Sequence, residues 1–175
     1  MREKRTPPPL DAGSLERLAL RYVERFATTQ GKLADYLTRK IRERGWDGVA
    51  ADPRGLATRM ADLGYVDDRA FAEAKAAALG RRGFGARRIG VALRQARVRE
   101  EDTVELAPAI ADRAVEAALT FARRKRIGPY GNGDTDRAVR EKQFAAMLRA
   151  GHGFELSRRI IAAEPAEEVD PARFE

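Results

Sequence analysis

The sequence predicts an all-α protein built from amphipathic helices, and three observations lead to this prediction. Strong helix formers, chiefly alanine, leucine, arginine and glutamate, dominate the composition, whereas runs of β-branched residues are nearly absent. Hydrophobic residues make up 43% of the chain and charged residues 35%, which suits helices with one buried stripe and one solvated face. Apolar residues also recur at spacings of three and four, and the buried stripe expected for the first helix consists of Leu15, Leu18, Tyr22, Val23 and Phe26.

Helix starts and stops in the first third of the chain predict three helices. Ser14 is the expected N-cap of the first helix, and Thr28-Thr29 end that helix and can cap the second, because such hydroxyls can accept a free backbone N–H of the first turn. Gly45 ends the second helix. The Asp-Pro pair at 52–53 then combines an acidic N-cap with a proline at the first helical position, where its missing N–H costs nothing.

Six more helices are expected in the rest of the chain. Asp67-Asp68 opens the fourth helix and the acidic run 100–102 opens the sixth. Pro108 is expected to end the sixth helix, since proline lacks the N–H that continues it. Glycine, proline and asparagine make 127–135 a loop. With their capping residues, the nine helices are expected at 14–28, 29–45, 52–64, 67–80, 86–96, 100–108, 110–126, 136–150 and 155–163.

The nine helices fall into three similar groups of three. The second helix of each group ends in basic residues that precede a large apolar residue, Trp46, Val98 or Phe154. A repeat of this length predicts tandem three-helix units packed in a row. Trp46, Phe71 and Phe154 are expected in the core. The predicted organisation is a disordered segment 1–13, repeats at 14–64, 65–108 and 109–163, and an acidic tail 164–175.

Charge is spread unevenly along the chain. The tail 164–175 holds five acidic residues and one arginine, a net charge of −4, while the whole chain carries +7, which leaves +11 for the rest. A body this basic predicts a polyanionic partner, with nucleic acid as the first expectation. An arginine-rich composition that serves no binding role is the alternative.

Several function classes are excluded or disfavoured. The chain has no cysteine, which excludes disulfides and thiolate sites, and its one histidine excludes multi-histidine metal sites. His152, between two glycines, is expected at an exposed turn, and Asp67-Asp68 is expected to cap a helix rather than to hold a metal. We expect no cofactor and no enzymatic activity. No signal peptide and no apolar run of roughly 20 residues is seen, so a cytoplasmic protein is expected.

Clustered basic residues are the candidate binding site. Segment 80–99 contains seven arginines and no acid, and Arg87, Arg94 and Arg97 are expected on one helix face. A guanidinium can grip a phosphate or carboxylate with two hydrogen bonds; solvated faces and helix-end cations are the alternative. The candidates are Arg81, Arg82, Arg87, Arg88, Arg94 and Arg97, then Arg39, Lys40 and Arg42, and Arg123, Arg124 and Lys125.

The segment 63–98, LGYVDDRAFAEAKAAALGRRGFGARRIGVALRQARV, resembles the central signature of the RecX family. The resemblance extends to the flanks 19–41 and 140–161. The chain departs from the family pattern at Leu79, where a basic residue is usual, and at 96–97, where Lys-Gly is usual. The matching residues are Gly64, Asp67, Asp68, Phe71, Ala72, Gly83, Phe84, Gly85, Ile89, Leu93 and Arg94.

The resemblance implies both an architecture and a function. It implies three three-helix repeats in an elongated, curved array that binds in the groove of the RecA–DNA filament. It further implies that the protein lowers ATP hydrolysis and strand exchange by this recombinase, within DNA repair, DNA recombination and the SOS response, and that a monomer contacts single- or double-stranded DNA weakly. A stand-alone, non-sequence-specific DNA-binding protein is the alternative.

Overall fold

The computed structural model describes residues 8–133, 136–166 and 168–174, and all regular structure in these ranges is helical. The chain divides into two compact units. The first contains the residues up to Phe71 together with Ala96–Arg99, and the second contains Ala72–Gln95 and the residues from Glu100 onward. The α-helices are α1 Ala12–Val23, α2 Gln30–Arg44, α3 Pro53–Asp62, α4 Asp68–Arg81, α5 Ala86–Gln95, α6 Glu100–Ala111, α7 Ala114–Lys125, α8 Arg137–Arg149 and α9 Phe154–Ala162; the short 3-10 helices are η1 Gly128–Tyr130 and η2 Pro171–Phe174.

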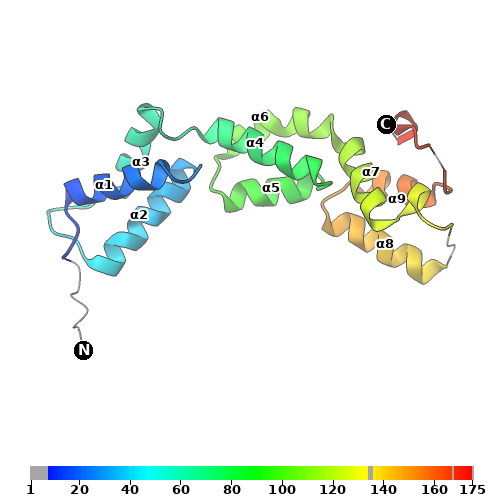
Figure 1. Ribbon diagram of the computed structural model, residues 1–175, viewed down its shortest axis with the longest axis horizontal. Helices are drawn as coiled ribbons and strands as arrows, with labels where there is room; N and C mark the ends of the chain where they lie inside the picture. Colours follow the sequence, from blue (N-terminus) through cyan, green and yellow to red (C-terminus); the bar gives the residue numbers. More distant parts are fainter. Residues whose placement is uncertain (1–7, 134–135, 167, 175) are drawn as a thin grey trace. The chain divides into compact units, whose positions relative to one another are not determined.

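Helices α1, α2 and α3 pack against one another in the first unit (Figure 1). Leu33, Leu37 and Met60 are completely buried between them, because the apolar residues of each helix recur on one face. The predicted caps of α2 and α3 are confirmed: the Thr29 hydroxyl accepts from Lys32 N at 3.2 Å, and Asp52 accepts from Gly55 N at 2.8 Å.

Packing and capping contacts occur earlier in the chain than the sequence predicted. Asp11, not Ser14, is the N-cap of α1, and Ser14 instead completes a capping box as the third helical residue. Leu10 is completely buried; its N–H donates to Gly45 O at 3.0 Å, and its carbonyl accepts from Asp47 N at 2.8 Å. The prediction of disorder is therefore wrong for 10–13, while residues 1–7 lie outside the described ranges.

Within the first unit, a second set of contacts ties the start of α2 to Asp68 and to residues 96–97. The Thr29 hydroxyl donates to Ala96 O at 2.5 Å, and buried Asp68 accepts from Gln30 N at 2.8 Å. Arg97 adopts a left-handed backbone conformation with φ 59°, and its Nε lies 3.0 Å from Asp35 Oδ2. Gly31 faces this turn without a side chain, so the two backbones can approach closely.

The pair Gly31 and Arg97 gives a test of this close packing. A methyl group at residue 31 would overlap the Arg97 Cβ and lie 3.0 Å from its carbonyl oxygen. We expect Gly31→Ala to lower the free energy of unfolding by about 2 kcal/mol, a typical overpacking cost. Arg97→Gly alone should change it little, because relief of the left-handed strain offsets the loss of an exposed ion pair. In the Arg97→Gly background, Gly31→Ala should lower the free energy of unfolding by less than half as much as it does in wild type. Equal costs in both backgrounds, measured by urea unfolding, would contradict the geometry.

In the second unit, α7, α8 and α9 enclose an apolar core (Figure 1). The turn between α4 and α5 packs onto the turn between α8 and α9: Gly85 N donates to Ala150 O at 2.9 Å, and Arg87 N donates to Gly151 O at 3.2 Å. Gly151 has φ 95°, a conformation that favours glycine. Backbone hydrogen bonds thus join the two turns directly.

The acidic tail is partly docked on this unit. Phe174, in η2, is only 5% exposed and joins the core formed by α7–α9. Arg159 on α9 donates to the Phe174 carbonyl, and Ala166 N donates to Pro129 O at 3.1 Å. A buried aromatic residue therefore fixes the end of a segment that the sequence identified only by its charge.

Two further sequence predictions are wrong. Pro108 lies inside α6 rather than at its end; the helix continues through Ala111, since only one backbone donor is lost and Asp112 N still donates to Pro108 O at 2.9 Å. Residues 110–111 therefore belong to α6, and α7 starts at Ala114. Phe154 is 54% exposed instead of buried, and its ring meets Phe144 edge-on at 4.9 Å.

Candidate interaction surfaces

Helix α5 presents a basic face of three exposed arginines, Arg87, Arg88 and Arg94, while Ile89 and Leu93 are buried on its other side. Arg87 and Arg94 are two helical turns apart and share one side of the helix. We call these three arginines the α5 basic face. No acidic residue lies in α5, so their charges face solvent without an acid on the same helix.

Arg97 does not belong to the α5 basic face. The prediction that it shares a helix face with Arg87 and Arg94 is wrong, because α5 ends at Gln95 and Arg97 has turned into the left-handed conformation. Its guanidinium is instead paired with Asp35 in the first unit.

The remaining arginines of this region are partly engaged by the protein itself. The Arg82 guanidinium lies over the Phe84 ring at 5.5 Å, and Arg124 Nη1 donates to the Arg82 carbonyl at 2.6 Å. Arg123 lies over the Tyr130 ring at 5.0 Å. Lys125 is exposed. The structure thus brings Arg82 and Arg124 together, although they are distant in the sequence.

The third basic cluster lies at the end of α2 and includes its own counter-ion. Lys40 Nζ lies 2.6 Å from Glu43 Oε2, and Arg39 Nε lies 3.6 Å from Glu43 Oε1. The Lys40 hydrogen bond lowers the pKa of Glu43, so this carboxyl stays ionised. Arg42 is exposed on the same helix.

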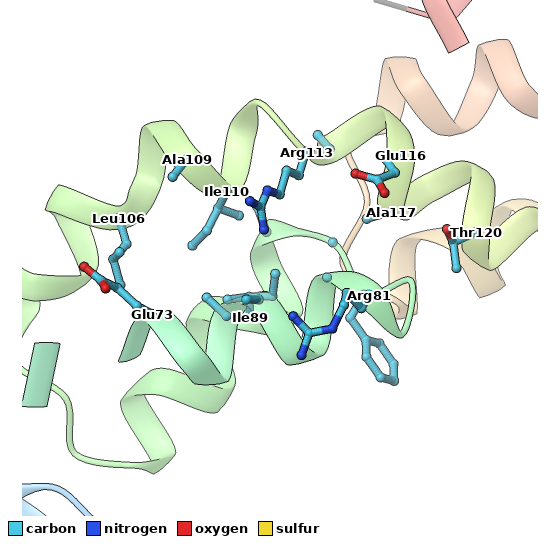
Figure 2. Close-up of a pocket in the computed structure, with 17 residues that line it drawn as sticks. Glu73, Arg81, Ile89, Leu106, Ala109, Ile110, Arg113, Glu116, Ala117 and Thr120 are labelled. Carbon is cyan, nitrogen blue, oxygen red and sulfur yellow. The ribbon is translucent and has the colours of Figure 1, made fainter. Parts of the chain in front are cut away.

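A groove of about 730 Å³ runs between α4–α5 and α6–α7 within the second unit (Figure 2). Alanine and glycine line much of its wall, and the larger apolar residues are Phe84, Ile89, Leu106 and Ile110. Figure 2 shows the side chains of Arg81 and Arg113 at this groove. Arg81 is therefore the one predicted binding residue that lines the groove.

His152 is buried, not exposed as predicted. Only 2% of its surface is exposed, and its Nε2 lies 3.1 Å from Gly83 O, at the contact between the two turns. Its ring also meets the Phe121 ring at 5.5 Å. Burial lowers the pKa of His152, and the contact with the Gly83 carbonyl only partly opposes this shift.

The single histidine predicts a pH dependence of stability. The unfolded chain binds a proton near the ordinary pKa of 6.5, whereas the folded chain binds it only at lower pH. The contribution of His152 to stability is therefore complete at pH values above the ordinary pKa of 6.5, and it declines as the pH falls below 6.5. Between pH 7.5 and 5.5, wild type should lose more free energy of unfolding than His152→Gln, which keeps a donor for Gly83 O. Equal losses in urea unfolding would show that His152 protonates freely in the folded state.

Neither a metal centre nor a membrane span is found in the described part of the chain. No group of three or more acidic, histidine or cysteine side chains there could hold a metal ion. Among the described helices, none combines the length and the apolar character that crossing a membrane requires.

These features define a helical protein whose prominent surfaces are basic helix faces. The chain is 31% identical to "Regulatory protein RecX" of Myxococcus xanthus, over 94% of this chain and 93% of that protein. It is 29% identical to "Regulatory protein RecX" of Agrobacterium fabrum, over 86% of this chain and 84% of that protein. No family model and no solved structure matches the chain. The chain belongs to the RecX family, and the relatives are named as regulatory proteins.

Proposed function

We propose that this chain binds the RecA–DNA filament and lowers both ATP hydrolysis and strand exchange by the recombinase. The observation that carries the proposal is the likeness to a RecX protein over 94% of the chain, which leaves little of either protein unmatched. The partner that the RecX resemblance implies is a polyanion–protein complex, and the basic surfaces described above suit it. Regulation would take place in the cytoplasm, with the chain acting as a monomer.

We further infer that the helices form three tandem repeats at 14–64, 65–108 and 109–163. A left-handed residue follows the second helix of each group, with φ 84° at Gly45, 59° at Arg97 and 95° at Gly151. The spacings, from 45 to 97 and from 97 to 151, are 52 and 54 residues. At each end a carbonyl accepts from an earlier segment: Gly45 O from Leu10, Ala96 O from Thr29 and Ala150 O from Gly85. A shared junction of this kind supports repetition.

The proposed mechanism is geometric. A curved row of repeats would lie along the filament groove and bridge neighbouring recombinase subunits, which would block entry of a second DNA or hamper filament growth. The α5 basic face would meet phosphates or acidic recombinase surfaces. Arginine suits both, because its planar fork binds either group with two hydrogen bonds.

Sedimentation of filaments tests the proposed partner. RecA assembled on circular single-stranded DNA with a slowly hydrolysed ATP analogue is pelleted in the presence of this protein at fixed physiological salt. We expect the protein to pellet with the filament at a concentration at which the same DNA alone, pelleted as a control, leaves it in solution. Equal recovery with filament and with DNA alone would contradict a filament-directed role.

The second candidate is a stand-alone DNA-binding protein that contacts phosphates without regard to sequence. The charge of +7 favours it, since each phosphate contact releases bound counter-ions. Steeply salt-dependent binding to bare DNA, together with indifference to the recombinase, would support this candidate over the first.

A further inference from the structure

Three aromatic rings from α1, the turn after it and α2 gather in the first unit. Tyr22 stacks on Tyr36, with ring centroids 4.2 Å apart and an interplanar angle of 22°. Phe26 follows, with its centroid 5.2 Å from that of Tyr22. The sequence predicted Phe26 as part of the buried stripe of the first helix, yet it lies beyond α1 and is 52% exposed. The row thus leads from half-buried tyrosines to an open aromatic surface.

Three cations surround these rings. The Arg25 guanidinium lies 5.8 Å from the Phe26 ring centroid. Arg39 and Lys40 lie 5.6 Å and 5.9 Å from the centroid of Tyr36. We call Tyr22, Phe26 and Tyr36 with these three cations the aromatic platform; all six residues lie within the first unit.

We propose that the aromatic platform binds single-stranded nucleic acid by stacking an unpaired base on Phe26. A single strand offers flat base faces and a phosphate chain side by side, which matches rings and cations at this spacing. A duplex hides its base faces within the stack, so it would engage only the cations. An apolar protein surface would bury Phe26 but would offer no negative charge to the surrounding cations.

Glu43 sets how much positive charge the platform presents. Its carboxylate lies 2.6 Å from Lys40 Nζ and 3.6 Å from Arg39 Nε, and it would repel a phosphate that approached either cation. Its pKa is lowered, so it carries its negative charge at neutral pH. Removing this charge should therefore strengthen binding of the strand, an effect opposite in sign to the loss of a ring.

Fluorescence anisotropy with a labelled oligothymidylate tests the platform directly. The full chain is titrated without recombinase at several NaCl concentrations, so the result does not depend on the proposed filament partner. Phe26→Ala should weaken binding by about fivefold or more and leave the salt slope unchanged, because stacking releases no counter-ions. Phe26→Trp should bind the oligonucleotide as tightly as wild type does, because tryptophan also offers a ring for stacking. Glu43→Gln should tighten binding and steepen the slope.

Phe154→Ala is the matched control, since Phe154 is equally exposed but lies in the second unit. It should bind the oligonucleotide as wild type does. The proposal is overturned if Phe26→Ala binds like wild type, or if a duplex of the same length binds as tightly as the single strand. It is also overturned if Phe26→Ala impairs only recombinase inhibition, because the platform would then be a protein contact.

Discussion

Gly85→Ala is expected to lower the free energy of unfolding by at least about 2 kcal/mol, the range typical of backbone overpacking. Its added methyl group would overlap the Gly151 carbonyl and lie 2.6 Å from His152 N. All the atoms it meets belong to the backbone, which cannot move aside as a flexible side chain does. The turns on either side would have to separate, with loss of the hydrogen bond from Gly85 N to Ala150 O. Urea unfolding followed by circular dichroism measures the change.

Gly80→Ala is the matched control for this effect. Gly80 lies inside α4, and a methyl group there would meet nothing within 4 Å. Alanine is the better helix former, so this variant should be more stable than wild type by about 0.5–1 kcal/mol. The account of the paired turns is wrong if the two alanine variants change stability in the same direction.

Reversing the α5 basic face should have the largest effect on function. The triple variant Arg87→Glu, Arg88→Glu and Arg94→Glu should weaken inhibition of the recombinase by at least about a hundredfold, since each charged hydrogen bond contributes about 1.5–3 kcal/mol. All three side chains are exposed, so helicity should be unchanged. Inhibition of RecA ATP hydrolysis, compared at equal concentrations of folded protein, measures the loss.

A second triple variant distinguishes an effect of the α5 basic face from an effect of the net charge of the protein. Arg137, Arg140 and Lys142 are exposed on α8, and their replacement by glutamate makes the same change in net charge. We expect it to weaken inhibition by less than about tenfold, as a long-range effect screened by salt. Equal losses in the two triples would mean that net charge, and not the α5 basic face, sets the affinity.

Local signals in the sequence predicted most helix boundaries. The N-caps Thr29 and Asp52 were correct, and so was Asp136 as the start of the eighth helix, because a cap is a contact between residues two or three positions apart. The prediction of Ser14 as an N-cap was wrong for a reason that is also local. Asp11 offers a stronger acceptor three residues earlier, and the two residues together form one capping box.

Local sequence signals could not predict contacts between residues that are far apart in the chain. His152 was predicted to be exposed and Phe154 buried, whereas the structure reverses both. The left-handed Gly151 turns the chain so that His152 meets Gly83, which is 69 residues away. Arg97 was placed on the wrong surface in the same way, since the usual glycine at this helix end is replaced here and the arginine reaches Asp35. No periodic pattern encodes such pairings.

The candidate site was predictable in composition but not in arrangement. Counting charges identified the arginines of 80–99, and the structure confirms that Arg87, Arg88 and Arg94 are exposed on one helix. Phe26 was missed because its spacing from Tyr22 and Val23 is that of a buried stripe. Only the end of α1 at Val23 leaves its ring open to solvent.

ATP hydrolysis by RecA on single-stranded DNA, measured while this protein is titrated at fixed physiological salt, tests the proposed regulation most directly. We expect dose-dependent inhibition that is complete below one molecule of this protein per recombinase subunit, because in the proposed mechanism one molecule would bridge neighbouring subunits of a filament. Unchanged hydrolysis with folded protein present, or inhibition only at ratios that cover the DNA, would contradict filament-directed regulation.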